Sequence, residues 1–205
     1  MSFELDSNRT ALVVIDIMKR VFSWESQPHP IQEVVSQTTR LVNAFRQAES
    51  FVVLVRVASV DGKDFLDPIT DPLPSTLLPH ALAEEPEDWS DILPALGSHP
   101  LDHLVTKHQW GAFFGTDLDL QLRRRNIDTI VLCGISTNIG VETTAREAYQ
   151  HGYNQVFATD AMNAYSEEEH RHTCTYILPR MGRIRSTDEI VAAVSGEPKA
   201  SRDQV

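Results

Sequence analysis

Apolar runs of strand length alternate with segments of helical spacing along most of the chain. The first run, Thr10–Asp16 (TALVVID), is continuously apolar up to its last residue, as expected of a strand buried on both faces. After it, apolar residues between Ile31 and Phe45 recur at helical spacing. Further strands are predicted at Phe51–Val57, Leu101–Thr106, Asp128–Gly134, Gln155–Thr159 and Gly182–Arg185.

Helix-start signals occupy the gaps between these strands. Asn138 can cap a helix that runs to about His151, with Gly152 just past its end. Strands separated by helices of this length imply parallel pairing, so the pattern predicts an α/β domain over residues 1–195. Residues 196–205 are predicted to be a disordered tail. Three pairs fit the capping-box signature: Thr116 with Asp119, Ser166 with Glu169, and Ser186 with Glu189.

The segment 59–100 interrupts this alternation. It holds seven of the eleven prolines, together with Trp89 and several acidic residues, and shows little periodicity. A loop of this length in a compact domain is usually a functional lid or an interface segment. Because its apolar residues need burial, we also expect the chain to self-associate as a homo-oligomer, a dimer or a tetramer.

Composition excludes several classes of partner. The chain has 205 residues, which suits one domain, and 29 acidic against 18 basic side chains give a net charge of −11. Such a surface repels nucleic-acid phosphates and anionic lipid, so neither nucleic acid nor a membrane is an expected partner.

No apolar run approaches the ~18 residues of a membrane span, and the polar first residues do not resemble a signal peptide. With two distant cysteines, Cys133 and Cys174, we expect a reduced, cytoplasmic protein.

Polar groups stand at three predicted strand ends, where ligands bind in parallel sheets. Asp16 closes the first strand, Lys107 follows the third, and a turn from Gly134 to Gly140 follows the fourth and opens a helix. An acid beside an ammonium is a plausible catalytic pair, and a helix start can hold an anion. The alternatives are a turn-forming Asp, a solvated Lys and a tight strand-to-helix joint. The turn matches neither the P-loop nor the dinucleotide-binding spacing.

The segments around these residues resemble a known family. VVIDIMKRVF, KHQWGAFFGTDL and GISTNIGVETTAREA are similar, in order and spacing, to three signature blocks of the isochorismatase-like hydrolase superfamily. The resemblance implies a single three-layer α/β/α domain, Rossmann-like, with a six-stranded parallel sheet and helices on both faces. It also implies a cis peptide between Ile135 and Ser136. Amidases of the superfamily use an Asp, a Lys and a Cys, and the alignment puts that Cys at Gly140.

Several positions depart from the superfamily's pattern. Without a thiol at Gly140, a covalent cysteine intermediate is unavailable. Relatives of the nicotinamidase type bind a metal through Asp and His residues after the second strand, but the segment 57–64 has no histidine, so we expect neither a metal nor another cofactor. Met18 and Gly111 stand where Gln and Ser are frequent in the family. Ser136 and Thr137 supply hydroxyls, without a base that the motif places beside them.

Glycine at the cysteine position is also typical of true isochorismatases, which hydrolyse a vinyl ether without a covalent intermediate. The resemblance therefore implies a hydrolase for a small, anionic metabolite, in which Asp16 donates a proton and Lys107 orients the acid and a substrate carboxylate. The backbone of Ser136 and Gly140 would cradle an anion. Predicted substrate-contacting residues are Phe22, Arg56, Trp110, Phe113 and Thr137.

Two questions stay open at this point. A neighbouring Lys lowers the pKa of an Asp, whereas a general acid needs it raised, so burial and an anionic substrate must outweigh Lys107. Arg56 can meet a substrate carboxylate or form a structural ion pair. The alternative function is a non-catalytic family member that binds a metabolite or a partner protein, and a third is amidase chemistry through Thr137.

Overall fold

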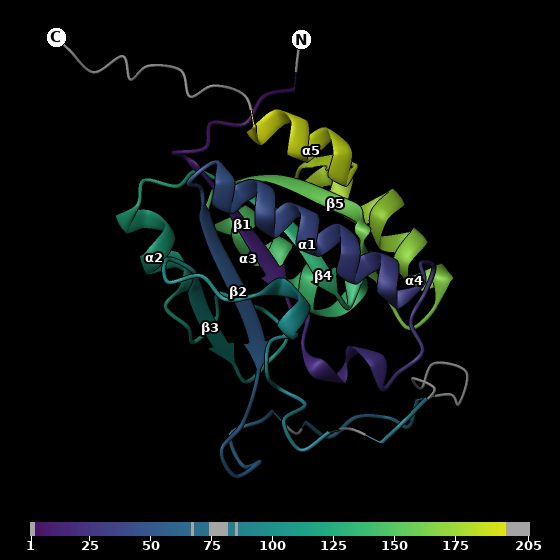
Figure 1. The fold of residues 1–205 in the computed structure, drawn as a ribbon. Coiled ribbons are helices and arrows are strands. Elements are labelled where there is room, and N and C mark those ends of the chain that lie inside the picture. Colours follow the sequence, from purple (N-terminus) through teal and green to yellow (C-terminus); the bar gives the residue numbers. More distant parts are fainter. Residues whose placement is uncertain (1–2, 67, 74–81, 85, 196–205) are drawn as a thin grey trace, which may run out of the picture.

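The computed structural model describes residues 3–66, 68–73, 82–84 and 86–195, so the predicted disorder of the tail 196–205 lies outside the described residues. It contains a six-stranded parallel sheet, covered by helices on both faces (Figure 1). The order of the strands in the sheet is β3-β2-β1-β4-β5-β6. The predicted fold class is confirmed. The strands are β1 (Thr10–Ile15), β2 (Phe51–Val57), β3 (His103–Lys107), β4 (Thr129–Ile135), β5 (Asn154–Asn163) and β6 (Arg183–Arg185).

All six predicted strands are present, and the largest difference is the length of β5. The apolar pattern predicts an end at Thr159, but β5 continues to Asn163, and its end pairs Met162 with Gly134 and Asn163 with Ile135. A register shift in β4 between Leu132 and Gly134 accompanies this extension. The last residues of β5 are therefore held in a strand by backbone pairing with β4, which the apolar pattern of the sequence does not reveal.

Helices form two layers because side chains of the central strand alternate between the two faces of the sheet. Leu12 and Val14 pack in one cluster with residues of α1 and α5, and Val13 and Ile15 pack in another with residues of α2 and α3. The helices are α1 (Ile31–Gln47), α2 (Leu118–Arg124), α3 (Glu142–Gln150), α4 (Glu167–His172) and α5 (Thr187–Val194).

The predicted helix starts are only partly correct. Ser166 and Ser186 cap α4 and α5 in complete capping boxes with Glu169 and Glu189, which confirms both predictions. The box of Thr116 with Asp119 is wrong, because α2 begins one residue later than that box requires and Asp117 occupies the N-cap position without a side-chain cap. Asn138 is not a helix cap either. Its side chain bonds Glu169 across to α4.

Short helical turns complete the fold, and two of them lie at the carboxyl ends of central strands. The π-helical turn η4 (Thr137–Val141) joins β4 to α3, and the 3-10 turn η1 (Lys19–Phe22) follows β1. The others are η3 (Pro94–Leu96), η5 (Thr173–Ile177) and η6 (Leu178–Arg180). None of the described helices is both long and apolar enough to cross a membrane.

The described part of the segment 59–100 runs past the carboxyl ends of the strands (Figure 1). Residues 89–92 of this segment, here called the return arm, are held by backbone contacts against η1 and the residue before it. Met18 forms an antiparallel bridge with Ile92, and the Arg20 N–H donates to the carbonyl of Trp89 at 3.2 Å. This pairing brings the proline-rich segment to the end of the sheet where ligands of parallel sheets bind.

Candidate active site

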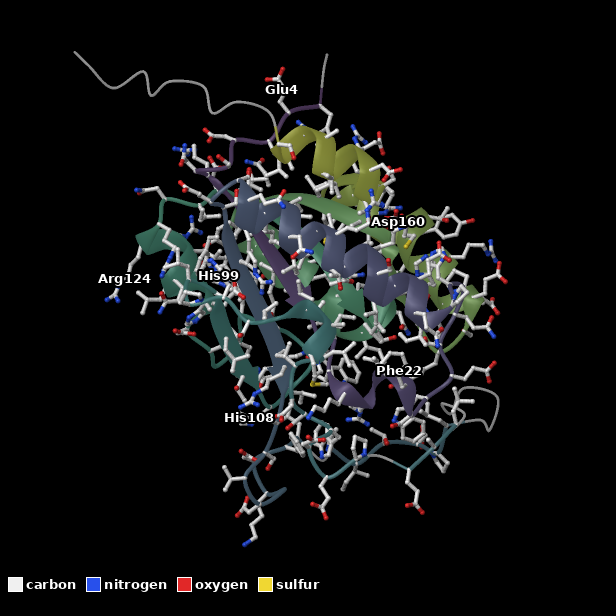
Figure 2. The ribbon with its side chains drawn as sticks, viewed as in Figure 1. Glu4, Phe22, His99, His108, Arg124 and Asp160 are labelled. Carbon is white, nitrogen blue, oxygen red and sulfur yellow. The ribbon has the colours of Figure 1, made fainter. Side chains whose placement is uncertain are left out.

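A pocket of about 960 Å³ lies beyond the carboxyl ends of the central strands. Asp16, Lys107 and Gly140 all line it, together with Ser136 and Trp110. Figure 2 shows His108, another lining residue, at this end of the sheet, and Arg124 and Glu4 away from it. The three strand-end signals of the sequence therefore meet in one pocket.

The polar centre of the pocket is an ion pair between Asp16 and Lys107. Asp16 follows β1 directly and has a φ of 53°, with its N–H donating to the carbonyl of Val55 at 3.0 Å. Lys107 ends β3, and its Nζ donates to Asp16 Oδ2 at 2.7 Å and to the Trp110 carbonyl at 2.6 Å. Because β2 lies between β1 and β3, the long lysine side chain is needed to span two strand spacings, about 10 Å.

Burial sets the proton affinity of this pair. The Lys107 side chain is 2% exposed, that of Asp16 is 15% exposed, and Asp16 Oδ1 is buried with no hydrogen-bond partner among the described residues. Burial raises the pKa of Asp16 above its usual value, while the charges of Lys107 and Arg20 act to lower it. Burial is the largest of these effects, so Asp16 can carry a proton at Oδ1 while Oδ2 accepts from Lys107.

Gly140 faces this ion pair from η4. A Cβ at position 140 would stand 3.3 Å from Asp16 Oδ2 and 3.3 Å from Lys107 Nζ. A side chain at this position would therefore contact both charged groups. With glycine there, the space beside the pair stays open to the pocket.

The turn between β4 and α3 is tied to α4 by two side-chain contacts. Its first peptide bond, Ile135–Ser136, is cis, as the resemblance implies. Ser136 Oγ donates to Asn138 Oδ1 at 2.9 Å, and Asn138 Nδ2 donates to Glu169 Oε1 at 3.1 Å. Thr137 Oγ1 lies 2.9 Å from His170 Nδ1. The shape of the pocket wall therefore depends on a helix that does not line it.

The contact with His170 bears on Thr137 as a nucleophile. The motif places no base beside this hydroxyl, but the fold does. Thr137 is nevertheless completely buried and does not line the pocket, so its hydroxyl faces the core and not a substrate. The geometry gives no support to amidase chemistry through Thr137.

Three other predicted substrate contacts lie elsewhere. Phe113 does not line the pocket and packs in the core, with its ring 5.2 Å from that of His151. Arg56 is likewise outside the lining and pairs with Asp91 at 3.4 Å, which favours a structural ion pair over contact with a substrate carboxylate. Phe22 is 41% exposed and outside the lining as well. Trp110 is the aromatic residue of the predicted set that lines the pocket.

Sequence reasoning missed several lining residues. Trp89 and Arg20 come from the return arm and from η1, which only the tertiary fold brings together. Glu147 lies on α3 with its carboxylate where a Cβ of residue 111 would be, so Gly111 leaves room for it. The spacing of Glu147 from Gly140, two helical turns on one face, was a usable signal. Other lining residues are Trp24, Gln109, Phe114, Thr143 and Tyr165.

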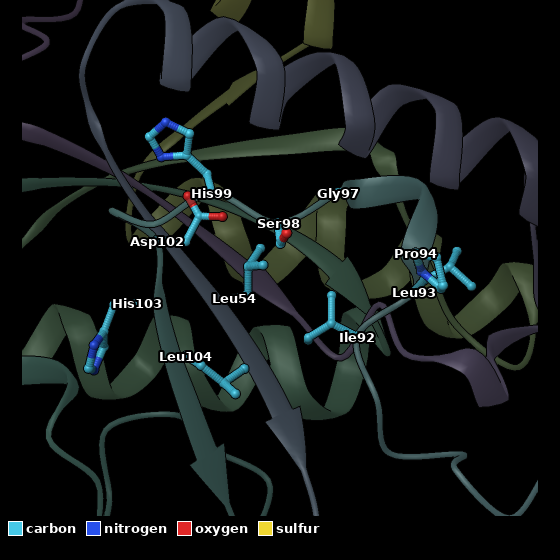
Figure 3. Close-up of a pocket in the computed structure, with 10 residues that line it drawn as sticks. All are labelled: Leu54, Ile92, Leu93, Pro94, Gly97, Ser98, His99, Asp102, His103 and Leu104. Carbon is cyan, nitrogen blue, oxygen red and sulfur yellow. The ribbon is translucent and has the colours of Figure 1, made fainter.

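A second, smaller hollow of about 490 Å³ lies at the β3 edge of the sheet (Figure 3). Leu54, Leu104 and His99 line it, and its one carboxylate, Asp102, pairs with Arg46 at 2.5 Å. None of the predicted site residues lies there. Among the described residues, moreover, no group of three His, Cys, Asp or Glu side chains could hold a metal ion. The larger pocket is therefore the candidate active site.

The isochorismatase domain family matches residues 10–189 of the chain. YwoC, an uncharacterized isochorismatase family protein of Bacillus subtilis, is 49% identical over 193 residues, which cover 94% of this chain and 98% of the relative. YecD of Escherichia coli O157:H7, of the same family, is 47% identical over 93% of this chain and 99% of the relative. The solved structure of an isochorismatase family protein from Burkholderia thailandensis superposes with a TM-score of 0.84 at 42% identity, covering 96% of this chain and 100% of that one. The chain belongs to the isochorismatase family.

Proposed function

We propose that the chain is an isochorismatase-family hydrolase that acts on a small anionic metabolite without a covalent enzyme intermediate. The bond that it hydrolyses in this proposal is the C–O bond of a vinyl ether. The observation that carries this proposal is the Asp16–Lys107 pair at the base of the pocket, with one buried carboxyl oxygen left unpartnered among the described residues. A buried carboxyl with a raised pKa is the kind of group that acts as a general acid near neutral pH.

The absence of a side chain at Gly140 supports a mechanism without a covalent step. The resemblance of its segment to the family's third signature block places this residue where the amidases carry their cysteine, and a Cβ here would stand 3.3 Å from Asp16 Oδ2 and from Lys107 Nζ. Cys133 is fully buried in β4 and burial raises the pKa of its thiol to about 12, so it offers no thiolate to a substrate. Water is then the nucleophile that the proposal requires.

The proposed reaction balances with these groups alone. The Asp16 carboxyl donates its proton to the terminal methylene of the enol ether, whose C=C electrons form the new C–H bond and leave an oxocarbenium ion. Water adds to the cationic carbon and gives one proton back to the Asp16 carboxylate. The resulting hemiketal breaks its C–O bond to release pyruvate and the alcohol. Lys107 holds Oδ2 throughout, so Oδ1 is the oxygen that carries the proton.

Pyruvate release from isochorismate, followed by a coupled assay, tests this proposal. We expect turnover by the wild type, loss of turnover in Asp16→Asn, and wild-type rates in Asp188→Asn, which makes the same chemical change on an exposed residue of α5. Because the acid must be protonated, kcat should fall as the pH rises through the raised pKa of Asp16. Turnover retained by Asp16→Asn would contradict the assigned role.

The alternative is a family member that binds a metabolite without converting it. It predicts a ligand that binds the wild type with no product formed. Absence of turnover with isochorismate in every variant would remove that substrate, and binding without turnover would favour the alternative.

A further inference from the structure

The turn after β3, residues 108–114, carries the backbone atom that holds Lys107. The Trp110 carbonyl accepts from Lys107 Nζ at 2.6 Å, and the same ammonium pairs with Asp16 Oδ2 at 2.7 Å. Lys107 is almost completely buried, and these contacts use two of its three N–H donors. The place of Lys107 beside the acid therefore depends on where this turn lies.

Two side chains of α3 hold the turn after β3 by its backbone. Thr144 Oγ1 accepts from the N–H of Ala112 at 3.1 Å, and Glu147 Oε2 accepts from the N–H of Phe113 at 3.0 Å. The turn lies beyond the pairing of β3 with β2, which ends at Lys107. Ala112 and Phe113 are both buried, so the loss of either acceptor would leave a buried N–H unpaired.

Thr144 also joins this turn to the turn after β4. Its hydroxyl donates to the Gly140 carbonyl at 2.7 Å while it accepts from Ala112, so one oxygen holds both backbone segments. Donation to the carbonyl four residues earlier is common for a helical threonine, but acceptance from a distant segment is not part of that pattern. Thr144 is completely buried and does not line the pocket, so its effect on a reaction would pass through the turns that it holds.

Glu147 occupies space that the glycine at position 111 leaves open. A Cβ on Gly111 would lie 2.3 Å from Glu147 Oε2 and 2.4 Å from Oε1, closer than nonbonded carbon and oxygen atoms approach. The carboxylate therefore lies directly against the backbone of the turn after β3, and from there it reaches the N–H of Phe113. Gly111 and Glu147 fit one another as a pair.

We propose that Thr144 and Glu147 are positioning residues of the acid pair, which hold the Trp110 carbonyl where it keeps Lys107 against Asp16. This inference rests on the proposed function, because it names the residues that position the same acid. Neither residue transfers a proton in it. Their two hydrogen bonds act on neighbouring N–H groups of one short turn, so loss of either lets the Trp110 carbonyl move away from Lys107 Nζ.

Titration of Asp16, followed by NMR of its carboxyl carbon, tests the proposal without any turnover. The signal is assigned by its absence in Asp16→Asn. Burial raises the pKa of Asp16, and the charges of Lys107 and Arg20 lower it. Because a less closely held Lys107 lowers it less, we expect the pKa of Asp16 to rise by about half a unit or more in Thr144→Val. Thr144→Ser, which keeps the hydroxyl, should retain the wild-type titration.

A second pair of variants acts at Glu147 and carries the test if Thr144→Val fails to fold. Glu147→Gln and Glu147→Leu both remove the charge, but only glutamine keeps an acceptor for the N–H of Phe113. We therefore expect the pKa of Asp16 to be higher in Glu147→Leu than in Glu147→Gln.

Thr39→Val is the matched control for Thr144→Val. Thr39 also donates to the carbonyl four residues earlier in its helix, that of Val35 at 2.8 Å, but it lies on α1, which packs on the other face of the sheet. It should keep both the wild-type titration of Asp16 and the wild-type kcat.

In the coupled pyruvate assay, Thr144→Val and Glu147→Leu should lower kcat by about tenfold to a hundredfold and leave KM almost unchanged, because a displaced acid acts in the transition state. An unaltered titration of Asp16 in both variants would overturn the positioning role, whatever the turnover. A shifted titration in a chain whose wild type does not hydrolyse isochorismate would instead reject that reaction and support the positioning role. The two proposals can therefore fail separately.

Discussion

At position 140, a missing side chain leaves open the space beside two charged groups. The Cα of Gly140 faces Asp16 Oδ2, Lys107 Nζ and the Cγ2 atom of Ile15, and a Cβ would stand 3.1 to 3.3 Å from each of them. These distances are shorter than ordinary van der Waals contact, so the ion pair would have to move by a few tenths of an ångström to admit even a methyl group.

Gly140→Ala is therefore expected to lower kcat while leaving the fold intact. Displacement of a proton donor by a fraction of an ångström should lower kcat by roughly tenfold to a hundredfold, while overpacking by one methyl should cost about 1 kcal/mol of unfolding free energy. Steady-state kinetics and thermal unfolding of the same preparation separate the two effects. An unchanged kcat would show that position 140 does not face the reacting atoms.

His170 is a buried group whose protonation opposes folding. Burial, with a smaller contribution from His29, lowers its pKa from 6.5 to about 4. In the unfolded chain the imidazole gains its proton near pH 6.5, so its contribution to stability is complete above that pH and is lost as the pH falls toward 4.

The free energy of unfolding of His170→Gln should consequently depend less on pH. Between pH 7 and pH 4 the wild type should lose about 2–3 kcal/mol relative to this variant. Denaturant unfolding at several pH values measures the difference. His172→Gln, which changes an exposed residue of the same helix, serves as the control and should keep the wild-type pH dependence. Parallel curves for the wild type and His170→Gln would refute this role for His170.

Among the elements, α4 matters to the pocket although it does not line it. Glu169 accepts from the Ser166 backbone and hydroxyl through Oε2 and from Asn138 through Oε1, so one carboxylate joins the helix cap to the turn after β4. The second capping box, of Ser186 with Glu189 on α5, has the same chemistry, but its hydrogen bonds to described residues stay within α5 and do not reach that turn.

These two boxes form a matched pair for mutation. Ser166→Ala and Ser186→Ala should each lower the unfolding free energy by about 1 kcal/mol, because each removes a helix N-cap. Only Ser166→Ala should also reduce kcat, since it loosens Glu169 and, through Asn138, the turn that carries Ser136 and Gly140. Equal kinetic effects of both substitutions would mean that stability, and not the position of the turn, controls the rate.

For the whole molecule, the strand order places the candidate site at the carboxyl ends of the two central strands of the sheet. Asp16 and the turn after β4 follow the two central strands, which are paired on both sides, whereas β3 and β6 lie at the edges. Self-association of the chain stays a prediction, as does the metabolite that it converts.

Amide hydrogen exchange should reproduce this order. Peptides from β1 and β4 should exchange slowest, because exposing their amides requires global unfolding, while those from the edge strands β3 and β6 should exchange through local opening. Mass spectrometry of the exchanged peptides measures the gradient. Rapid exchange in β1 would be incompatible with its place at the centre of the sheet.

The amino-acid sequence by itself predicted the six strands except for the end of β5, the class of fold, and the two charged residues at the centre of the candidate site. The reason is that apolar runs and strand ends are local features. Asp16 directly follows one parallel strand and Lys107 ends another, so both lie at the same edge of the sheet independently of the loops between them. The two capping boxes of α4 and α5 were predictable for the same reason.

The tertiary structure alone decided which side chains face the pocket. Arg56 lies in a predicted strand, yet its direction depends on the pleat and on Asp91, which turn it away, while Arg20 reaches the pocket because a distant arm pairs with η1. Thr137 stands in the site motif, but the π-helical turn directs it to His170 in the core. Side-chain direction in turns and loops depends on contacts distant in sequence, and local patterns carry no record of those contacts.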